Sequence, residues 1–210
     1  MSLFSFIALF IAQLGSVVIA GHQVAISFTS LAFMLPLSMA MAITVRVGYG
    51  FGQHSPTQVW ISLVSGMSMA IVMGVFLAVF TYVFNHQIVA IYSQDPQVLA
   101  LAASLLVFAA LYQVFDAIQV AAAGALRGLH DTQITMLVTF VSYWGVGLGL
   151  GYLMAFTHVL GDPMGVKGFW LGILLGLGLA AILLVWRLKR ILAVTFTTVL
   201  PLKTVPSSEI

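Results

Sequence analysis

The chain has 210 residues, of which 62% are hydrophobic and only 6% are charged, and it contains no cysteine. Soluble domains carry about a quarter charged residues, so this composition excludes a water-soluble fold. The absence of cysteine excludes disulfides and thiolate metal sites, and a net charge of only +2 does not indicate a nucleic-acid partner.

The hydrophobic residues form long, continuous runs. In lipid, every backbone polar group must be paired within the structure, which leaves helices or closed barrels. Barrel strands alternate apolar and polar residues, whereas these runs are apolar throughout and mostly reach the length of about 20 residues that a spanning helix needs. We therefore predict an all-α membrane protein, a six-transmembrane-helix bundle. Its spans cover residues 1–14, 16–47, 57–84, 96–126, 132–156 and 166–191.

Three segments depart from this regular pattern. Residues 1–14 are short for a span and have no basic leader, which predicts a truncated first helix in a fragmentary chain and no cleavable signal peptide. Residues 85–93 predict an amphipathic interfacial stretch. Residues 194–210 contain two prolines and a Ser-Ser pair, which is typical of a disordered tail. We therefore divide the chain into a six-helix lobe, residues 1–193, and a cytoplasmic tail, residues 194–210.

Basic residues near the ends of spans orient a membrane protein, because cytoplasmic loops are rich in Lys and Arg. The basic residues that follow even-numbered spans are Arg46, Arg127, Arg187, Lys189, Arg190 and Lys203. Only Lys167 follows an odd-numbered span, beside the acids Asp95 and Asp162. We expect both termini in the cytoplasm.

Asp116 is the most informative position because it lies well inside the fourth span. A carboxylate there costs about 2.5 kcal/mol or more, so it normally faces a cavity or the bundle interior. Tyr112, Asp116, Gln119 and Ala123 follow helical spacing on one face. This face offers a carboxylate, an amide and an aromatic ring that can attract a cation. We predict a cation site at Asp116 and Tyr112 that exchanges H⁺ or Na⁺. The alternative is a protonated structural residue that holds two helices together.

The second span carries a polar stripe. Its members are Gln23, Ser27, Ser30, Met34 and Ser38. Pro36 removes a backbone hydrogen bond and is expected to kink the helix. We interpret Gln23, Ser27 and Ser30, with Gln119, as candidate cleft-lining residues and Pro36 as a hinge. Ordinary interhelical hydrogen bonding is the simpler explanation of the serines.

The glycines indicate packing. Gly145, Gly147, Gly149 and Gly151 lie inside an apolar span and follow no strand, so a dinucleotide loop is excluded by context. Together with Gly168, Gly172 and Gly176 they form small-xxx-small pairs that allow close helix approach. The five histidines have no ligand spacing, so we expect no metal site beyond Na⁺ at Asp116, and no cofactor.

Several sequence stretches together resemble the multidrug and toxic compound extrusion (MATE) family, particularly its NorM-type bacterial members. They are AGHQVA at 20–25, SLAFMLPLS at 30–38, RVG at 46–48, YQVFD at 112–116, AGALRG at 123–128, DT at 131–132, SYW at 142–144, GY at 151–152 and GFWLG at 168–172. Their order and spacing match nearly the whole chain.

The resemblance implies the C-terminal lobe, helices seven to twelve, of a two-lobed antiporter. Such transporters export cationic or amphipathic compounds in exchange for Na⁺ or H⁺. Asp116 matches the family's cation-site aspartate, and Tyr112 matches its nearby aromatic residue. The glutamate that completes this site in the family would fall before Met1. The partners implied are membrane lipid, a small drug-like or cationic substrate, and an N-terminal lobe or a second copy of the chain.

Three other functions compete with this expectation of an antiporter in the bacterial inner membrane. The absent glutamate favours a non-transporting membrane subunit or a degenerate fragment. A flippase of related fold would need a basic cavity for its anionic substrate, and no Arg or Lys lies in the middle of a span. An intramembrane enzyme is disfavoured because Asp116 has no second carboxylate, His pair or nucleophile at helical spacing.

Overall fold

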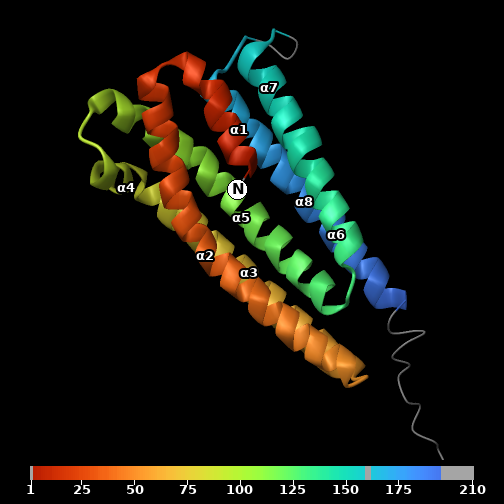
Figure 1. Ribbon diagram of the computed structural model, residues 1–210. Helices are drawn as coiled ribbons and strands as arrows, with labels where there is room; N and C mark the ends of the chain where they lie inside the picture. The colour runs from red at the N-terminus through yellow and green to blue at the C-terminus, as the bar shows by residue number, and fades with distance from the viewer. Residues whose placement is uncertain (1, 159–161, 195–210) are drawn as a thin grey trace, which may run out of the picture.

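The computed structural model describes residues 2–158 and 162–194, which form a bundle of helices without a strand (Figure 1). In chain order the elements are α1 (Ser2–Ile11), the 3₁₀ turn η1 (Ala12–Leu14), α2 (Ser16–Gly52), α3 (Pro56–Val83), α4 (Asn85–Tyr92), α5 (Pro96–Gly128), α6 (Thr132–Phe140), the π-helix η2 (Val141–Leu148), α7 (Gly149–Phe156) and α8 (Val166–Val194). The all-α fold class is therefore confirmed. Of the predicted tail, residues 195–210 lie outside the described part.

Five segments of the described chain are long and apolar enough to cross a membrane. They are Ser16–Gly52, Pro56–Val83, Pro96–Gly128, Thr132–Phe156 and Val166–Val194. They correspond to the second to sixth predicted spans, and α4 corresponds to the predicted interfacial stretch. With ten residues, α1 is about 15 Å long, half the thickness of the hydrocarbon core. This agrees with the expectation of a short first segment.

Two long helices begin in the same way, with a capping residue followed by a proline. Pro56 and Pro96 occupy the first turns of α3 and α5, where a missing N–H costs nothing. The residue before each proline caps the helix: Ser55 accepts from the backbone N–H of Gln58, and Asp95 accepts from that of Gln97 at 2.8 Å. Asp95 therefore has a structural role at a helix start.

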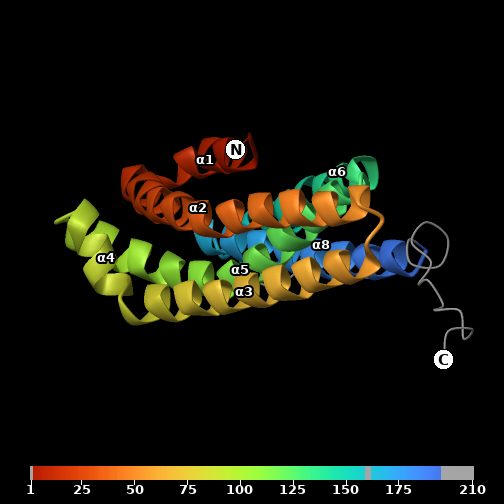
Figure 2. The same ribbon diagram turned by 90° about the horizontal axis from the view of Figure 1, so that it is seen from below.

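The central helix is α5, which contacts α2, α3 and α8. Seen from below, α3 lies on one side of α5, and α1 and α2 lie on the other (Figure 2). Two hydrophobic clusters fill the bundle. The first includes Ile7, Leu105, Leu106, Tyr112, Phe169, Trp170 and Leu177. The second includes Ile43, Val47, Leu63, Leu126, Leu184 and Leu188. Along α5, Asp116 falls between the residues of the first cluster and those of the second.

Glycines set the spacing between α8 and the fifth span. A Cβ atom added at Gly172 would lie 2.5 Å from the Gly147 oxygen and from the Gly151 Cα. Gly168 and Gly176 are equally tight against residues of the same span. The predicted packing role is therefore seen at these positions, whereas a Cβ added at Gly149 would have no atom of the described residues within 4 Å outside its own helix turn. Close contact of this kind is how helices associate in lipid.

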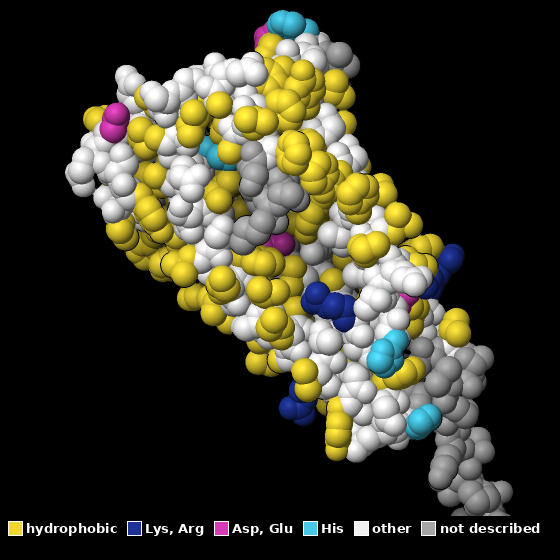
Figure 3. Space-filling view, in the orientation of Figure 1, with side chains coloured by type: hydrophobic (Ala, Val, Ile, Leu, Met, Phe, Trp, Pro, Cys, Tyr) yellow, Lys and Arg dark blue, Asp and Glu magenta, His cyan; other side chains and the backbone are white. Residues whose placement is uncertain are grey.

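The outer surface is mainly apolar. Large hydrophobic side chains of α3, among them Val72, Phe76 and Val79, are more than half exposed. Figure 3 shows the acidic and basic side chains of one face as isolated spots among hydrophobic atoms. Such a surface suits contact with lipid.

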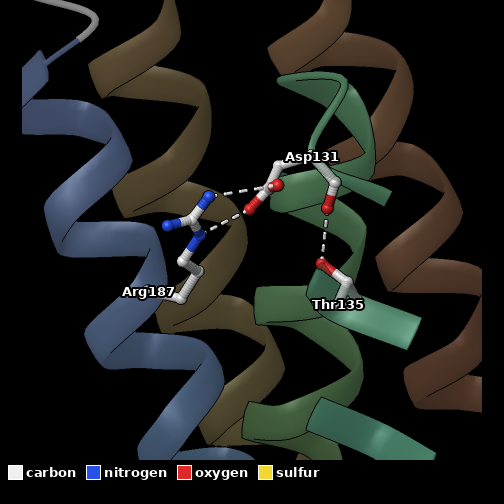
Figure 4. A network of polar contacts seen from close by, with 3 residues as sticks. All are labelled: Asp131, Thr135 and Arg187. Carbon is white, nitrogen blue, oxygen red and sulfur yellow. Dashed lines mark hydrogen bonds and ion pairs between the residues drawn. The ribbon is translucent and has the colours of Figure 1, made fainter. Parts of the chain in front are cut away.

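An ion pair ties the α5–α6 turn to α8 (Figure 4). Arg187 donates from Nε to Asp131 Oδ2 at 2.8 Å and from Nη2 to Oδ1 at 3.3 Å. The Thr135 hydroxyl donates to the Asp131 backbone oxygen at 2.6 Å. The side chains of Asp131 and Arg187 are only 13% and 29% exposed, so the pair is largely shielded from water and its two-point geometry adds strength.

We expect Asp131→Ala and Arg187→Ala each to lower the free energy of unfolding. Their coupling in a double-mutant cycle should be about 1 kcal/mol. Denaturant unfolding of the protein in detergent measures both quantities. Lys189→Ala is the matched control, because Lys189 is exposed on the same helix. If the two substitutions have strictly additive effects on the free energy of unfolding, the ion pair contributes nothing to stability.

Candidate functional site

A cavity lies beside Asp116 in the middle of the bundle. Its volume is about 270 Å³. Its walls come from α2, α3, α5, η2 and α8, and the polar side chains among them are Thr29, Ser30, Gln113, Tyr112, Asp116 and Tyr143. The other lining residues are hydrophobic or small, including Phe33, Pro36 and Leu177. We call this space the Asp116 cavity.

Asp116 is the acidic residue of this cavity, and its side chain is half-buried. Among the described residues, its carboxylate has no hydrogen-bond or ion-pair partner. Tyr112 and Tyr143 line the same cavity as Asp116. A carboxylate in an apolar cavity is neutralised by a proton or by a bound cation, because the charged form alone is costly there.

Tyr112 is held firmly in place. Its side chain is only 5% exposed. Its ring stacks on Trp170 with a centroid distance of 6.0 Å. Trp170 in turn donates from Nε1 to His22 Nδ1 at 3.2 Å. This stacking covers part of the Tyr112 ring and leaves less of its π surface for a cation.

Gln113 is a further polar group in the wall. It lies one turn before Asp116 on α5 and is 7% exposed. Its Oε1 accepts a hydrogen bond from the Thr81 hydroxyl at 3.0 Å. Its Nε2 has no protein partner among the described residues. A buried amide with unused donors is uncommon in folded proteins.

A second cavity of about 470 Å³ lies further along α5. Gln119, Ala123 and Arg127 line it from α5, facing α6 and η2. Phe33 and Tyr143 line both cavities, and the Tyr143 hydroxyl donates to Gln119 Oε1 at 3.0 Å. The predicted face of α5 is therefore shared between two spaces: Tyr112 and Asp116 line the first, and Gln119 lines the second.

The candidate residues of α2 do not all line the same cavity. Ser30 and Pro36 line the Asp116 cavity, but Gln23 and Ser27 do not. Gln23 is exposed, while its neighbour His22 is almost fully buried. Successive residues of a helix point about 100° apart. Because the buried face of α2 includes His22, the next residue, Gln23, falls on a different and exposed face.

The predicted hinge residue, Pro36, lies inside α2, which is one continuous helix from Ser16 to Gly52.

Three polar residues of the cavity, Thr29, Gln113 and Tyr143, were not predicted from the sequence. Gln113 could have been found, because it lies three residues before Asp116 and shares its helix face. Tyr143 could not, because it lies in the π-helix η2, whose backbone turns side chains away from α-helical positions.

The family model for MatE matches residues 1–153. The chain belongs to the MatE family. Among solved structures, a eukaryotic MATE transporter, AtDTX14, is 23% identical, with a TM-score of 0.82 over 91% of this chain and 43% of that chain. A MATE structure in the bent conformation is 20% identical, with a TM-score of 0.82 over 95% and 44%.

A Vibrio cholerae MATE transporter, VcmN, in the bent form is 18% identical, with a TM-score of 0.81 over 93% and 44%. At these identities the likeness concerns the fold. This MatE chain spans less than half the length of the transporters that it matches. Its fold thus resembles half of a MATE transporter.

Proposed function

We propose that this chain is the C-terminal lobe of a multidrug efflux antiporter, which exports cationic or amphipathic compounds in exchange for Na⁺ or H⁺. The observation that carries the proposal is the Asp116 carboxylate, which faces a cavity inside the bundle without a protein partner among the described residues. Membership of the MatE family supports a transport role for this carboxylate.

In this proposal Asp116 binds the coupling cation in one conformation of the transporter and releases it in another. Release needs a change in the walls of the cavity, and movement of two lobes against each other around a central site supplies such changes in transporters. The other lobe is a separate N-terminal polypeptide, the remainder of a longer chain, or a second copy of this chain. Tyr112 and Gln113 line the same cavity as the carboxylate, and in this proposal Pro36 lets α2 bend.

The proposed location is a bacterial inner membrane, with both termini in the cytoplasm. The ends of α2 and α5 and the end of α8, which carry Arg46, Arg127 and Arg187, lie at the same end of the bundle (Figure 1). Cytoplasmic loops are enriched in such residues. A flippase for anionic substrates is less well supported, because no Lys or Arg of the described residues lines the Asp116 cavity and Arg127 lines only the second one.

Accumulation of ethidium, a fluorescent organic cation, tests the transport role in bacteria that lack their own efflux pumps. The chain is expressed alone and together with an N-terminal lobe from the MatE family. We expect lower accumulation with both lobes than with the N-terminal lobe alone. Unchanged accumulation, with both polypeptides present in the membrane, would contradict transport and indicate a non-transporting subunit.

A further inference from the structure

A buried hydrogen bond joins α2 to α8 close to Tyr112. Trp170 is fully buried and His22 is 1% exposed. The indole Nε1–H of Trp170 donates to His22 Nδ1 at 3.2 Å, and the two rings meet edge to face at 84°. A buried indole N–H requires such an acceptor, because an unpaired donor is costly away from water. His22 therefore supplies the acceptor for Trp170.

Glycines on the opposite face of α8 determine where Trp170 points. Gly168 and Gly172 lie two residues before and after Trp170, so both are about 200° around the helix from it. Cβ atoms added there would lie 2.6 Å from the Ala155 nitrogen and 2.5 Å from the Gly147 oxygen, both in the fifth span. Because that face of α8 is pressed against the fifth span, Trp170 points toward α2 and α5.

Trp170 lies behind Tyr112 as seen from the Asp116 cavity. The two rings stack with a centroid distance of 6.0 Å and an interplanar angle of 29°. Tyr112 lines the cavity, whereas Trp170 and His22 do not. Tyr112 and Asp116 are four residues apart on α5, so they are neighbours on one face of the helix. The indole of Trp170 thus supports the ring that shares the cavity wall with Asp116.

The hydrogen bond to His22 restrains the indole plane. The outer torsion of an aromatic side chain has a broad range, so packing and hydrogen bonds determine the plane of the ring. The N–H lies at the edge of the indole, and its bond to His22 opposes rotation about that torsion. Protein interiors are too densely packed to absorb a tilted ring without movement of its neighbours. A tilt of Trp170 would therefore displace Tyr112.

We propose that His22 is a positioning residue of the cation site. Through Trp170 it holds the Tyr112 ring where the ring attracts a cation bound at Asp116. Neither His22 nor Trp170 touches the cation. This inference rests on the proposed function in its assignment of the cation site to Asp116 and Tyr112.

Two substitutions of His22 separate the hydrogen bond from the packing. Asparagine and leucine have nearly the same branched shape. The Oδ1 of asparagine is attached to Cγ, as Nδ1 is in histidine, and can accept from the Trp170 N–H, whereas leucine has no acceptor. The full chain in lipid nanodiscs carries 3-fluorotyrosine at Tyr112 alone, and its ¹⁹F NMR signal reports the surroundings of that ring. We expect His22→Leu to shift this signal and His22→Asn to leave it near the wild-type position.

Binding of radioactive ²²Na⁺ to the same variants measures the effect on the cation site. His22→Leu should raise the Kd for Na⁺ about three- to tenfold, which is typical of effects transmitted through packed side chains. His22→Asn should bind nearly as the wild type does, and Asp116→Asn should lose binding.

His86→Leu is the matched control, because His86 is exposed on α4. It should change neither the ¹⁹F signal nor the Kd. Size-exclusion chromatography shows whether each variant is folded. If His22→Leu does not fold, His22→Phe takes its place, because phenylalanine keeps an aromatic ring and has no acceptor.

The possible failures are distinct. An unchanged ¹⁹F signal in the folded His22→Leu variant overturns the inference, and so does a His22→Asn variant that behaves as His22→Leu does. A shifted signal with an unchanged Kd also overturns it, because His22 is then only structural. If the wild-type chain does not bind Na⁺, the inference is overturned, whereas proton-coupled transport is decided by flux measurements. If Na⁺ binding survives Asp116→Asn, both the inference and the assignment of the site fail.

Discussion

Asp116→Asn should abolish cation-coupled efflux while the protein remains folded and in the membrane. Asparagine has nearly the same shape as aspartate, but it carries no charge and releases no proton. A carboxylate interacts strongly with a cation in a low-dielectric cavity, and its loss should reduce the initial rate of efflux by at least about tenfold. Ethidium efflux from preloaded cells that contain both lobes measures this rate.

The comparison variant is Asp95→Asn. Asp95 is exposed and caps α5 through the backbone N–H of Gln97, and asparagine caps helices about as well. Efflux should be unchanged in this variant. Coupled efflux that survives in Asp116→Asn at the wild-type rate would show that the cation binds elsewhere.

Gly172→Ala should destabilise the bundle strongly, and Gly172→Val should prevent folding. The Cβ of alanine would lie 2.5 Å from the Gly147 oxygen and the Gly151 Cα, and 2.6 Å from the Gly151 nitrogen. These are backbone atoms, so the two helices must move apart. Overpacking of this kind typically costs about 1–3 kcal/mol for small additions and more for larger ones.

Gly178 provides the control on the same helix. A Cβ at Gly178 meets no atom of another described segment within 4 Å, so Gly178→Val should leave stability nearly unchanged. Thermal unfolding in detergent, followed by size-exclusion chromatography, compares the variants. Equal melting temperatures for Gly172→Ala and Gly178→Ala would show that α8 does not pack as closely on the fifth span as the structure indicates.

The helices were predictable because lipid leaves few alternatives. Continuous apolar runs between Pro56 and Val83 or between Pro96 and Gly128 have one structural solution in a membrane, and the prolines and capping residues mark where each helix begins. The family was also recognisable, because many short motifs occur in the right order. Neither prediction required knowledge of how the helices pack.

The Asp116 site was predictable only in part. A carboxylate inside a span is conspicuous because burial is so costly. Which residues lie around it depends on how each helix is rotated about its own axis. A stripe of polar residues fixes that rotation only to within about one residue position. The polar stripe therefore predicted Gln23 as a cleft-lining residue, whereas its side chain is exposed.

Sequence patterns do not predict contacts between segments that are distant in the chain. Tyr143 reaches the cavity from a π-helix, which no simple periodicity predicts. Arg187 was interpreted only as an orienting charge, yet it pairs with Asp131 across the bundle. Both interactions follow from packing, which joins residues that have no fixed spacing in the chain.

Substrate flux in proteoliposomes tests most directly whether the lobe couples transport to a cation. Both lobes are reconstituted, and gradients of Na⁺ or of H⁺ are imposed in each direction across the membrane. We predict that an organic cation moves against one of these gradients, that its direction reverses when the gradient is reversed, and that Asp116→Asn eliminates the effect. Substrate that equilibrates at the same rate whatever the gradients, in the wild type and in Asp116→Asn alike, would contradict cation coupling at Asp116.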